Sequence, residues 1–353
     1  MKKSMTQHVS IAALDSIGLD LAHESSVFCH LSRDGKILEK GRIPMTRPEM
    51  RKAFEARPRS TVLMEACTPS SWVATLLEEI GHDVVVCNPR RLKVISSSSF
   101  KTDELDARAL ARIARMRQFE PDCVVVTTVR ARETLLARSI LSGREQLMRM
   151  RTGLISHVRN VLVADAVPKP KCDADDFATT MRRLKLPADV WSVIEPLVET
   201  IEVINGKIKG MEAQIKGLLK EMEVARRWND IPGVGRLTML AFALTIEDPS
   251  RFPSARAVGP FLGLVPSVYQ TGAVERRGRI TKQGDERMRR LLVQAAYSLM
   301  RSTADCALRR WGLKLAALRG KKKAAIAVAR KLAVIMMRMW TTGEDFVPFP
   351  QAA

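Results

Sequence analysis

Four acidic residues in the first third of the chain have the types and spacing that suit metal-dependent chemistry. Asp20 lies in I-G-L-D-L-A and Glu65 in L-M-E-A, both in apolar segments, and Asp103 and Asp106 lie in K-T-D-E-L-D-A-R. On a helix, residues three apart share a face. Carboxylates among apolar residues are costly to bury unless they are neutralised. A pair of divalent ions neutralises them, and can activate the attacking oxygen and stabilise the leaving oxygen in phosphodiester transfer.

The expected metal is Mg²⁺ or Mn²⁺, because carboxylate oxygens favour hard ions. The six cysteines and five histidines are scattered without ligand spacing, which indicates neither a zinc site nor a disulfide framework. Each acid also has a purely structural interpretation. Asp20 would be a hydrogen-bonding acid in a strand, Glu65 a cap of the following loop, Asp103 an acid favoured by a helix start, and Asp106 a surface ion-pair partner.

Alternating strands and helices between residues 10 and 125 must position these acids. Asp34-Gly35 between two apolar runs predicts a hairpin. Pro48 suits the first turn of a short helix, and Gly81 ends a longer one. The expected strands cover 17–21, 27–31, 37–43, 61–66 and 83–87, and the expected helices cover 48–56 and 70–80. This order is typical of an RNase H-like sheet, although other mixed α/β domains share it.

The middle of the chain, residues 126–228, has the period of long helices. Apolar residues alternate every three and four positions from Ile194 to Met222, which is a heptad seam. A looser version runs from Leu136 to Val161. Pro196 lies early in the seam, where the helix is expected to start or kink. We expect two long helices that either fold back within one subunit or pair between chains as an oligomerisation region.

The last region, residues 229–353, combines a glycine turn with cationic helices. The segment I-P-G-V-G at 231–235 either brings backbone N–H groups to a phosphate or is only a tight turn. Helices are expected at 255–262, 285–301 and 324–340. Between Asp305 and Glu344 the sequence has ten Lys and Arg residues and no acid, which favours contact with a phosphate backbone. The main candidates are Lys321, Lys322, Lys323, Arg330 and Lys331.

The composition predicts a polyanionic partner. The chain carries a formal net charge of +20 over 353 residues, and each cation near a phosphate releases a counterion. A ribosomal-type structural protein or a basic membrane-surface protein is the alternative. The apolar runs are too short to span a bilayer, and the N-terminus lacks a signal-peptide core. We therefore expect a cytoplasmic, nucleic-acid-binding protein with two or three domains.

These motifs resemble the DEDD transposases of the insertion-sequence 110/1111 family, which includes the Piv/MooV DNA invertases. The resemblance runs through nearly the whole chain, from about Ile17 to Trp340. Its segments are G-L-D-L-A at 18–22, M-E-A at 64–66, N-P-R-R at 88–91, K-T-D-E-L-D-A-R-A-L at 101–110, I-P-G-V-G at 231–235, F-L-G-L-V-P at 261–266 and R-G-R-I-T-K-Q-G-D at 277–285. The acidic set and the last two segments, in this order and spacing, are specific.

The resemblance implies a fold, a site and partners. Asp20, Glu65, Asp103 and Asp106 would be the metal ligands of a RuvC-like domain, followed by a helical coiled-coil region and a mainly helical C-terminal transposase domain. The family's active site is composite: a serine of the C-terminal domain attacks DNA and becomes covalently attached. The implied partners are donor and target DNA, a structured guide (bridge) RNA that pairs with both, and further copies of the chain in a dimer or tetramer.

The sequence departs from the family pattern at the nucleophile. Where relatives usually carry Ser-Gly, this chain reads Y-Q-T-G at 269–272, so Thr271 takes the nucleophile position. Threonine keeps the hydroxyl and can be a covalent nucleophile, but its β-methyl stiffens χ1 and crowds an in-line attack. A weakened enzyme or a role for Ser267 is the alternative. The cations that follow could clamp a phosphate or form a basic surface loop; they are Arg276, Arg277, Arg279 and Lys282.

Three functions are compatible with these residues. The first is an RNA-guided DNA transposase or recombinase that works through a covalent protein–DNA intermediate, in transposition or in site-specific inversion. The second is a hydrolytic nuclease of the junction-resolvase kind, which uses the same four acids with water. The third is a scaffold that binds RNA or DNA without catalysis.

Overall fold

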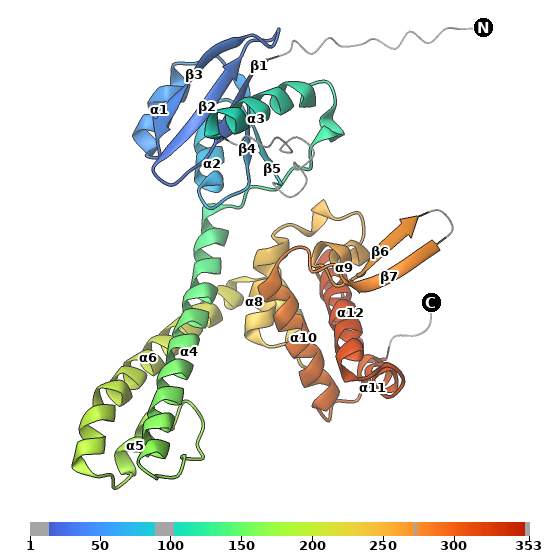
Figure 1. Cartoon of the computed structure of the whole chain (residues 1–353). Helices are drawn as coiled ribbons and strands as arrows, with labels where there is room; N and C mark the ends of the chain where they lie inside the picture. The colour runs from blue at the N-terminus through green and yellow to red at the C-terminus, as the bar shows by residue number, and fades with distance from the viewer. Residues whose placement is uncertain (1–13, 89–101, 272–273, 350–353) are drawn as a thin grey trace. The chain divides into compact units, whose positions relative to one another are not determined.

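The computed structural model describes residues 14–88, 102–271 and 274–349. They form two compact units, of which the first ends at Glu133 and the second begins at Thr134 (Figure 1). The further division of the second unit, predicted near residue 228, stays a prediction. No helix in the described part of the chain is both long and apolar enough to cross a bilayer.

A mixed five-stranded sheet forms the centre of the first unit. Its strands are β1 (Asp15–Asp20), β2 (Ser25–Leu31), β3 (Ile37–Pro44), β4 (Ser60–Glu65) and β5 (Asp83–Cys87), in the order β3-β2-β1-β4-β5. The first three strands form an antiparallel meander, with Gly35 at φ +84° in the predicted turn. β4 pairs in parallel with both β1 and β5. The predicted strands are confirmed, and the sheet is consistent with an RNase H-like domain.

Helices cover both faces of this sheet, because its central strands alternate two apolar sets. α1 (Arg47–Glu55) and α2 (Ser70–Ile80) pack on the face that presents Ile17 and Leu19. α3 (Asp103–Arg117) packs on the opposite face, against Cys29 and Leu63. Gly81, at φ +103°, ends α2 as predicted. A short 3₁₀ turn at Pro121–Cys123 follows α3.

The second unit begins with a helical hairpin made of α4 (Arg132–Ala164), the short α5 (Phe177–Arg183) and α6 (Ala188–Glu221). α4 and α6 run antiparallel: Arg144 pairs with Glu212 at 2.6 Å, and Arg151 donates to Asn205 at 2.7 Å. The first part of the α6 seam is buried against α4 and α5 of the same chain, and its last part, at Ile215 and Leu219, is buried in a cluster with the beginning of α4. The long helices therefore fold back within one subunit, and pairing between chains stays a prediction. α6 starts before Pro196, so this proline does not begin the helix.

The rest of the second unit is a helical bundle with one two-stranded hairpin. At its centre, Trp228 packs edge-on against Phe242 and Trp340, with ring centroids 5.3 Å apart in each pair. The elements are α7 (Glu223–Trp228), α8 (Arg236–Ile246), α9 (Val258–Phe261), β6 (Pro266–Thr271), β7 (Val274–Ile280), α10 (Glu286–Arg301), α11 (Ala307–Arg319) and α12 (Lys321–Thr342), with 3₁₀ turns at Pro249–Arg251 and Ala255–Ala257.

The helix expected at 255–262 is present as a 3₁₀ turn that continues directly into the single-turn α9, and Gly263 at φ +66° turns the chain out of it. One expectation for this bundle needs correction. α11 and the β6–β7 hairpin occur where only a basic run and a nucleophile loop were expected. The helices expected at 285–301 and 324–340 are confirmed as α10 and α12.

Candidate active site

Asp20 and Glu65 end neighbouring parallel strands. Leu19 of β1 is in register with Met64 of β4, so the two acids follow as the next residues at the carboxyl end of the sheet. Burial raises the pKa of the Cys67 thiol, and the charges of Asp20 and Glu65 raise this pKa further. Both carboxylates therefore lie near one thiol, and the prediction that their strands run side by side is confirmed.

Helix α3 carries the other two acids toward the same edge. After the helix ends, the Gln118 side chain bonds the backbone N and O of Leu14, at 2.7 and 3.1 Å, where β1 begins. Farther along β1, Gly18 lies directly under the helix, where a Cβ would be 2.0 Å from the Ala107 carbonyl oxygen. α3 thus runs antiparallel to β1. Its acidic first turn points to the end of β1 that carries Asp20.

The surroundings of these acids are polar and partly open. Thr102 caps α3 by accepting from the Leu105 N–H at 3.3 Å. Asp103 lies 3.6 Å from an Arg42 nitrogen, with both side chains about 60% exposed, and Asp106 is half-buried. The first turn of a capped helix favours acids for structural reasons as well. Thus the structure leaves the metal-binding and the structural interpretations of Asp103 both in place.

A set made only of carboxylates fits Mg²⁺ or Mn²⁺ in chemistry. Within the described ranges, however, no three His, Cys, Asp or Glu side chains are close enough together to hold a metal ion. The four acids are gathered by topology at one edge, and their role as a joint ligand set stays a prediction. Residues 89–91 of the N-P-R-R segment and Lys101, which precedes α3, lie outside the described residues.

Thr271 is described by its backbone, as the last residue of β6. It is in register with Val274 of β7, so it stands at the turn end of the hairpin rather than in an irregular loop. Ser267, the alternative nucleophile, lies four residues earlier in the same strand. Its hydroxyl donates to the Arg279 carbonyl across the hairpin at 3.1 Å. The segment was expected to be a loop, and the structure gives its residues up to Thr271 the regular backbone of a strand.

Two glycines lock the base of this hairpin. Gly263 precedes β6 and Gly284 follows β7, and both have positive φ, +66° and +75°. A Cβ on Gly263 would be 2.3 Å from the Gln283 carbonyl oxygen, and one on Gly284 would be 2.2 Å from that of Phe261. The two connections therefore pack backbone against backbone, which only glycine permits. These contacts give a physical reason for Gly263 in F-L-G-L-V-P and for Gly284 in R-G-R-I-T-K-Q-G-D.

Helix α10 holds this base by a charged side chain. The Arg289 guanidinium donates to the carbonyls of Leu262 at 3.3 Å, Gln283 at 2.5 Å and Gly284 at 3.0 Å. One side chain thus joins the connection before β6 to the connection after β7. Arg289 was not predicted from the sequence, because nothing in its spacing distinguishes it from the neighbouring arginines.

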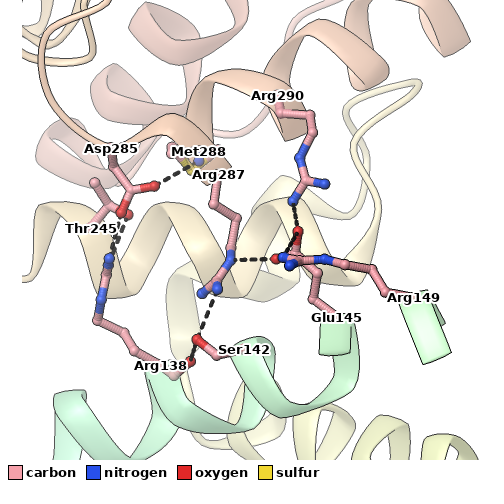
Figure 2. Close-up of polar contacts among 9 residues, drawn as sticks. All are labelled: Arg138, Ser142, Glu145, Arg149, Thr245, Asp285, Arg287, Met288 and Arg290. Atoms are coloured by element: carbon pink, nitrogen blue, oxygen red, sulfur yellow. Dashed lines mark hydrogen bonds and ion pairs between the residues drawn. The ribbon is translucent and has the colours of Figure 1, made fainter. Parts of the chain in front are cut away.

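Asp285 links the base of the hairpin to α4. Its carboxylate accepts from the Met288 N–H at 2.8 Å, which caps α10, and pairs with Arg138 of α4 (Figure 2). Burial would raise the pKa of Asp285, but the hydrogen bonds from Arg138 and Met288 hold this pKa below its ordinary value. Arg138 also donates to the Thr245 hydroxyl at 3.3 Å. This role of Asp285 was not predicted from the sequence, although an Asp before an apolar helix is a capping signal.

Glu145 makes a second link between α4 and α10. Its carboxylate accepts from Arg287 at 3.0 Å and from Arg290 at 2.5 Å, both on α10, and pairs with Arg149 on its own helix at 3.2 Å (Figure 2). Burial would raise the pKa of Glu145, but the three guanidinium groups lower it overall. The two links fix α4 against the helix that holds the hairpin.

The predicted nucleic-acid contacts fall into two groups. Arg279, Lys282, Lys323, Arg330 and Lys331 line one groove and are exposed. Of the others, Arg276 is exposed on β7, Arg277 is described by its backbone opposite Val268, and Lys321 and Lys322 are exposed at the start of α12. Three lysines lie at the N-terminus of α12, where the positive end of the helix dipole disfavours cations. Binding of an anion is therefore favoured at this position.

The I-P-G-V-G turn has a packing role. Gly233 has φ +85°, and a Cβ on it would be 2.6 Å from the Ala295 carbonyl oxygen of α10. This close approach accounts for the first glycine. Gly235 precedes α8 and has open space around its Cβ position. The tight-turn interpretation is thus sufficient for Gly233, and phosphate binding at α8 stays a prediction.

Two family models match this chain. One, a transposase model of the IS110 DEDD type, matches residues 17–164, and the other, described as the transposase IS116/IS110/IS902 family, matches residues 225–311. The first match contains all four acids, and the second contains the β6–β7 hairpin and α10.

Several transposases are similar to the chain over nearly their whole length. A "Probable family 20 transposase" of Pseudomonas aeruginosa is 28% identical over 92% of this chain and 96% of its own. The transposase for insertion sequence element IS1328 of Yersinia enterocolitica is 27% identical, covering 94% and 98%. The transposase for insertion sequence element IS1111A of Coxiella burnetii is 26% identical, covering 96% and 92%.

Proposed function

We propose that this chain, which belongs to the IS116/IS110/IS902 family of transposases and is a DNA transposase, exchanges DNA strands through a covalent protein–DNA intermediate. Its four acids would bind the metal ions, and the hydroxyl of Thr271 in the β6–β7 hairpin would attack the DNA. The observation that carries the proposal is the pair of strand ends in the first unit, where Asp20 and Glu65 stand side by side.

The carboxylate edge would hold the metal. Asp20 and Glu65 would bind from the sheet, and Asp103 and Asp106 would bind from the first turn of α3. When bound, Mg²⁺ or Mn²⁺ would supply activation of the attacking oxygen and stabilisation of the leaving oxygen. The near-antiparallel course of α3 along β1 supports this assignment, since it directs the acidic turn toward Asp20.

Thr271 would be the nucleophile. Its hydroxyl oxygen would form a bond to a DNA phosphorus, its proton would leave to solvent or a nearby base, and the DNA oxygen would depart with the bonding electrons. The phosphodiester energy would be conserved in the protein–DNA ester, so a second DNA hydroxyl could reverse the step and join a new strand. The regular strand and the glycine-locked base support the precise placement that such an attack needs.

The two halves belong to different units, so a complete site would assemble within one subunit or between subunits. Oligomerisation as a dimer or tetramer, together with guidance by a structured bridge RNA, is the arrangement that the family resemblance implies. The net charge of +20 supports a large nucleic-acid partner besides the DNA substrate. Sequencing the RNA that co-purifies with the protein tests this part: a single structured species with segments complementary to donor and target DNA is expected.

The alternative is metal-dependent hydrolysis of DNA by the same acids. The threonine favours it, because the β-methyl hinders Thr271 more than it would a serine. In this case water would attack, and the products would be free DNA ends. A non-catalytic scaffold would instead leave all DNA intact in the presence of Mg²⁺.

The test is a denaturing gel of end-labelled DNA after incubation with the protein and Mg²⁺. The proposal expects a labelled strand that remains attached to the protein, is lost with Thr271→Ala and is retained with Thr271→Ser. Equal amounts of free ends from the parent protein and Thr271→Ala would establish hydrolysis. Cleavage that persists unchanged in Asp20→Asn would refute the assignment of the carboxylates.

A further inference from the structure

A groove of about 1060 Å³ lies in the second unit between the base of the β6–β7 hairpin, α11 and α12. Its volume is slightly above the range of about 300–1,000 Å³ that is typical of small-molecule sites. The described residues that line the groove include six cations and no acid. The cations are Arg256, Arg279, Lys282, Lys323, Arg330 and Lys331. A groove with this lining attracts a polyanion.

The floor of the groove is apolar. Ile280 of β7, Trp311 of α11 and Ile335 of α12 contribute to it, and all three are half-buried. Along α12 the lining residues recur at Lys323, at 326–327, at 330–331 and at 334–335, which is one helix face. Cations and aliphatic residues therefore alternate on a single face, and the charge is not confined to a separate surface.

Trp311 contacts both the cationic and the apolar parts of the groove. The Lys331 ammonium nitrogen lies 4.0 Å from the centroid of the Trp311 ring, so an aromatic face and a cation adjoin inside the groove. Arg330 lies against Gly259, where a Cβ would be 3.2 Å from the Arg330 Nε. These positions give a phosphate and a neighbouring base adjacent binding groups.

A double helix and a single strand make different demands on such a groove. The phosphate backbone of a duplex is bound by cations and other polar groups, and the flat faces of its bases are stacked inside. A single strand exposes flat base faces beside its phosphates, so it is bound by cations combined with aromatic and apolar surface. A groove that combines an apolar floor with cations therefore suits a single strand better than a duplex.

We propose that this groove binds unpaired DNA nucleotides that flank the cleavage point. The inference rests on the proposed function for its choice of DNA. Pro266 begins β6 and lines the groove, whereas Thr271 ends the same strand. At about 3.3 Å per residue the groove lies roughly 17 Å from Thr271 along the strand. It therefore takes nucleotides a short distance from the reacting phosphate rather than that phosphate itself.

The test compares binding of the full-length protein to four labelled probes by fluorescence anisotropy. They are a 20-nucleotide oligothymidylate, an abasic strand of equal length and charge, a 20-base-pair duplex and a 20-nucleotide oligouridylate. We expect oligothymidylate to bind about tenfold more tightly than the abasic strand, since stacking on one aromatic side chain contributes by about this factor. Trp311→Leu should remove this preference and leave duplex affinity unchanged.

Matched variants separate charge from stacking. Arg330→Ala should weaken binding of the oligothymidylate, the abasic strand and the duplex by a similar factor, because it removes a phosphate contact. Lys209→Ala, which removes an exposed cation of α6, should change none of these affinities. If Trp311→Leu melts at a lower temperature than the parent, Ala327→Leu is the second variant: it fills the groove without altering charge and should abolish the same preference.

Two results would overturn the inference. The first is equal affinity of the parent protein for oligothymidylate and the abasic strand. The second is a preference for oligouridylate that Trp311→Leu removes, since the groove would then belong to an RNA. Failure of the covalent-attachment experiment together with a Trp311-dependent preference for oligothymidylate would refute the proposed chemistry and leave the groove assignment standing.

Discussion

The carboxylate edge and the nucleophile hairpin are positioned by different kinds of interaction. In the first unit, Asp20 and Glu65 are placed by strand pairing, and α3 is held along β1 by a glycine contact. In the second unit, the hairpin is a two-stranded ribbon whose base depends on Arg289 and on the Asp285–Arg138 pair. Because strand pairing uses backbone atoms, the positions of Asp20 and Glu65 should tolerate substitution of neighbouring side chains. The hairpin is held by a few polar side chains, so a single substitution among them should move it more easily.

The largest expected effect is on the acids. Asp20→Asn should reduce DNA cleavage by about a thousandfold, equivalent to ~4 kcal/mol, because it removes a charge from the proposed metal site. Asp103→Asn should also reduce cleavage strongly, whereas Glu104→Gln, the adjacent acid in the same helical turn, should retain activity. Initial rates at saturating Mg²⁺ measure both. Similar losses in Asp103→Asn and Glu104→Gln would mean that overall charge, rather than a ligand set, matters.

Gly18→Ala tests the packing of α3 on β1. The added Cβ would meet the backbone of Ala107, which cannot turn aside, so we expect a loss of about 3 kcal/mol in the free energy of unfolding. Gly206→Ala is the matched change in α6, where the Cβ position is open. It should stabilise its helix by about 1 kcal/mol. Urea unfolding measures both, and an unaffected Gly18→Ala protein would contradict the close contact.

Asp285→Ala tests the support of the hairpin. It removes a helix cap and leaves Arg138 without its carboxylate, so the second unit should lose about 2 kcal/mol of stability. Arg138→Met should cost less, because the cap remains. The double variant should recover part of the loss, and a double-mutant cycle in urea unfolding measures this coupling. Strict additivity would show that the two side chains do not depend on each other.

Thr271→Ser tests the strand-end hydroxyl itself. Removing the β-methyl should increase the yield of covalent protein–DNA adduct by about fivefold, which corresponds to the ~1 kcal/mol cost of a constrained rotamer. Ser267→Ala should leave the yield unchanged. A loss of adduct in Ser267→Ala, with Thr271→Ser unaltered, would move the nucleophile to Ser267.

Acid should affect the two units in different pH ranges. Burial lowers the pKa values of His30 and His82 in the folded first unit. These two side chains therefore bind protons more readily in the unfolded chain than in the folded one. The stability that these histidines contribute is therefore full above about pH 6.5 and declines as the pH falls below it. In the second unit, the lowered pKa values of Glu145 and Asp285 mean that stability is lost only below about pH 4. Hydrogen exchange at pH 7.5, 5.5 and 4.5 measures each unit separately.

The difference between local backbone structure in the first unit and long-range polar contacts in the second also determines what the sequence could predict. The strands and helices of the first unit were predictable, because Asp34-Gly35 and Gly81 mark local turns and the apolar periods are regular. So was the neighbourhood of Asp20 and Glu65, since both stand at ends of parallel strands. Long-range polar contacts leave no such periodic signal. Arg138 and Asp285 are 147 residues apart, and no local pattern relates them.

The β6–β7 hairpin was missed for a related reason. Most of its residues belong to segments that were interpreted by their chemistry, and charged residues such as Arg276 and Arg279 are uncommon in an alternating buried strand. Its base is held by the backbone contacts of Gly263 with Gln283 and of Gly284 with Phe261, and these residues are too far apart in sequence for a turn rule to connect them. The burial of the heptad seam within one chain was likewise undecided by the period alone, because hairpins and dimers present the same repeat.

The antiparallel course of α4 and α6 has a consequence for evolution and engineering. The beginning of α4 and the end of α6 meet in one core, so the polypeptide leaves and returns at the same place. α4 has 33 residues, which at about 1.5 Å per residue makes an arm roughly 50 Å long. Deleting or inserting matched heptads in both helices would change the reach of this arm without moving its root. Its length is thus a dimension that selection can adjust separately from the chemistry.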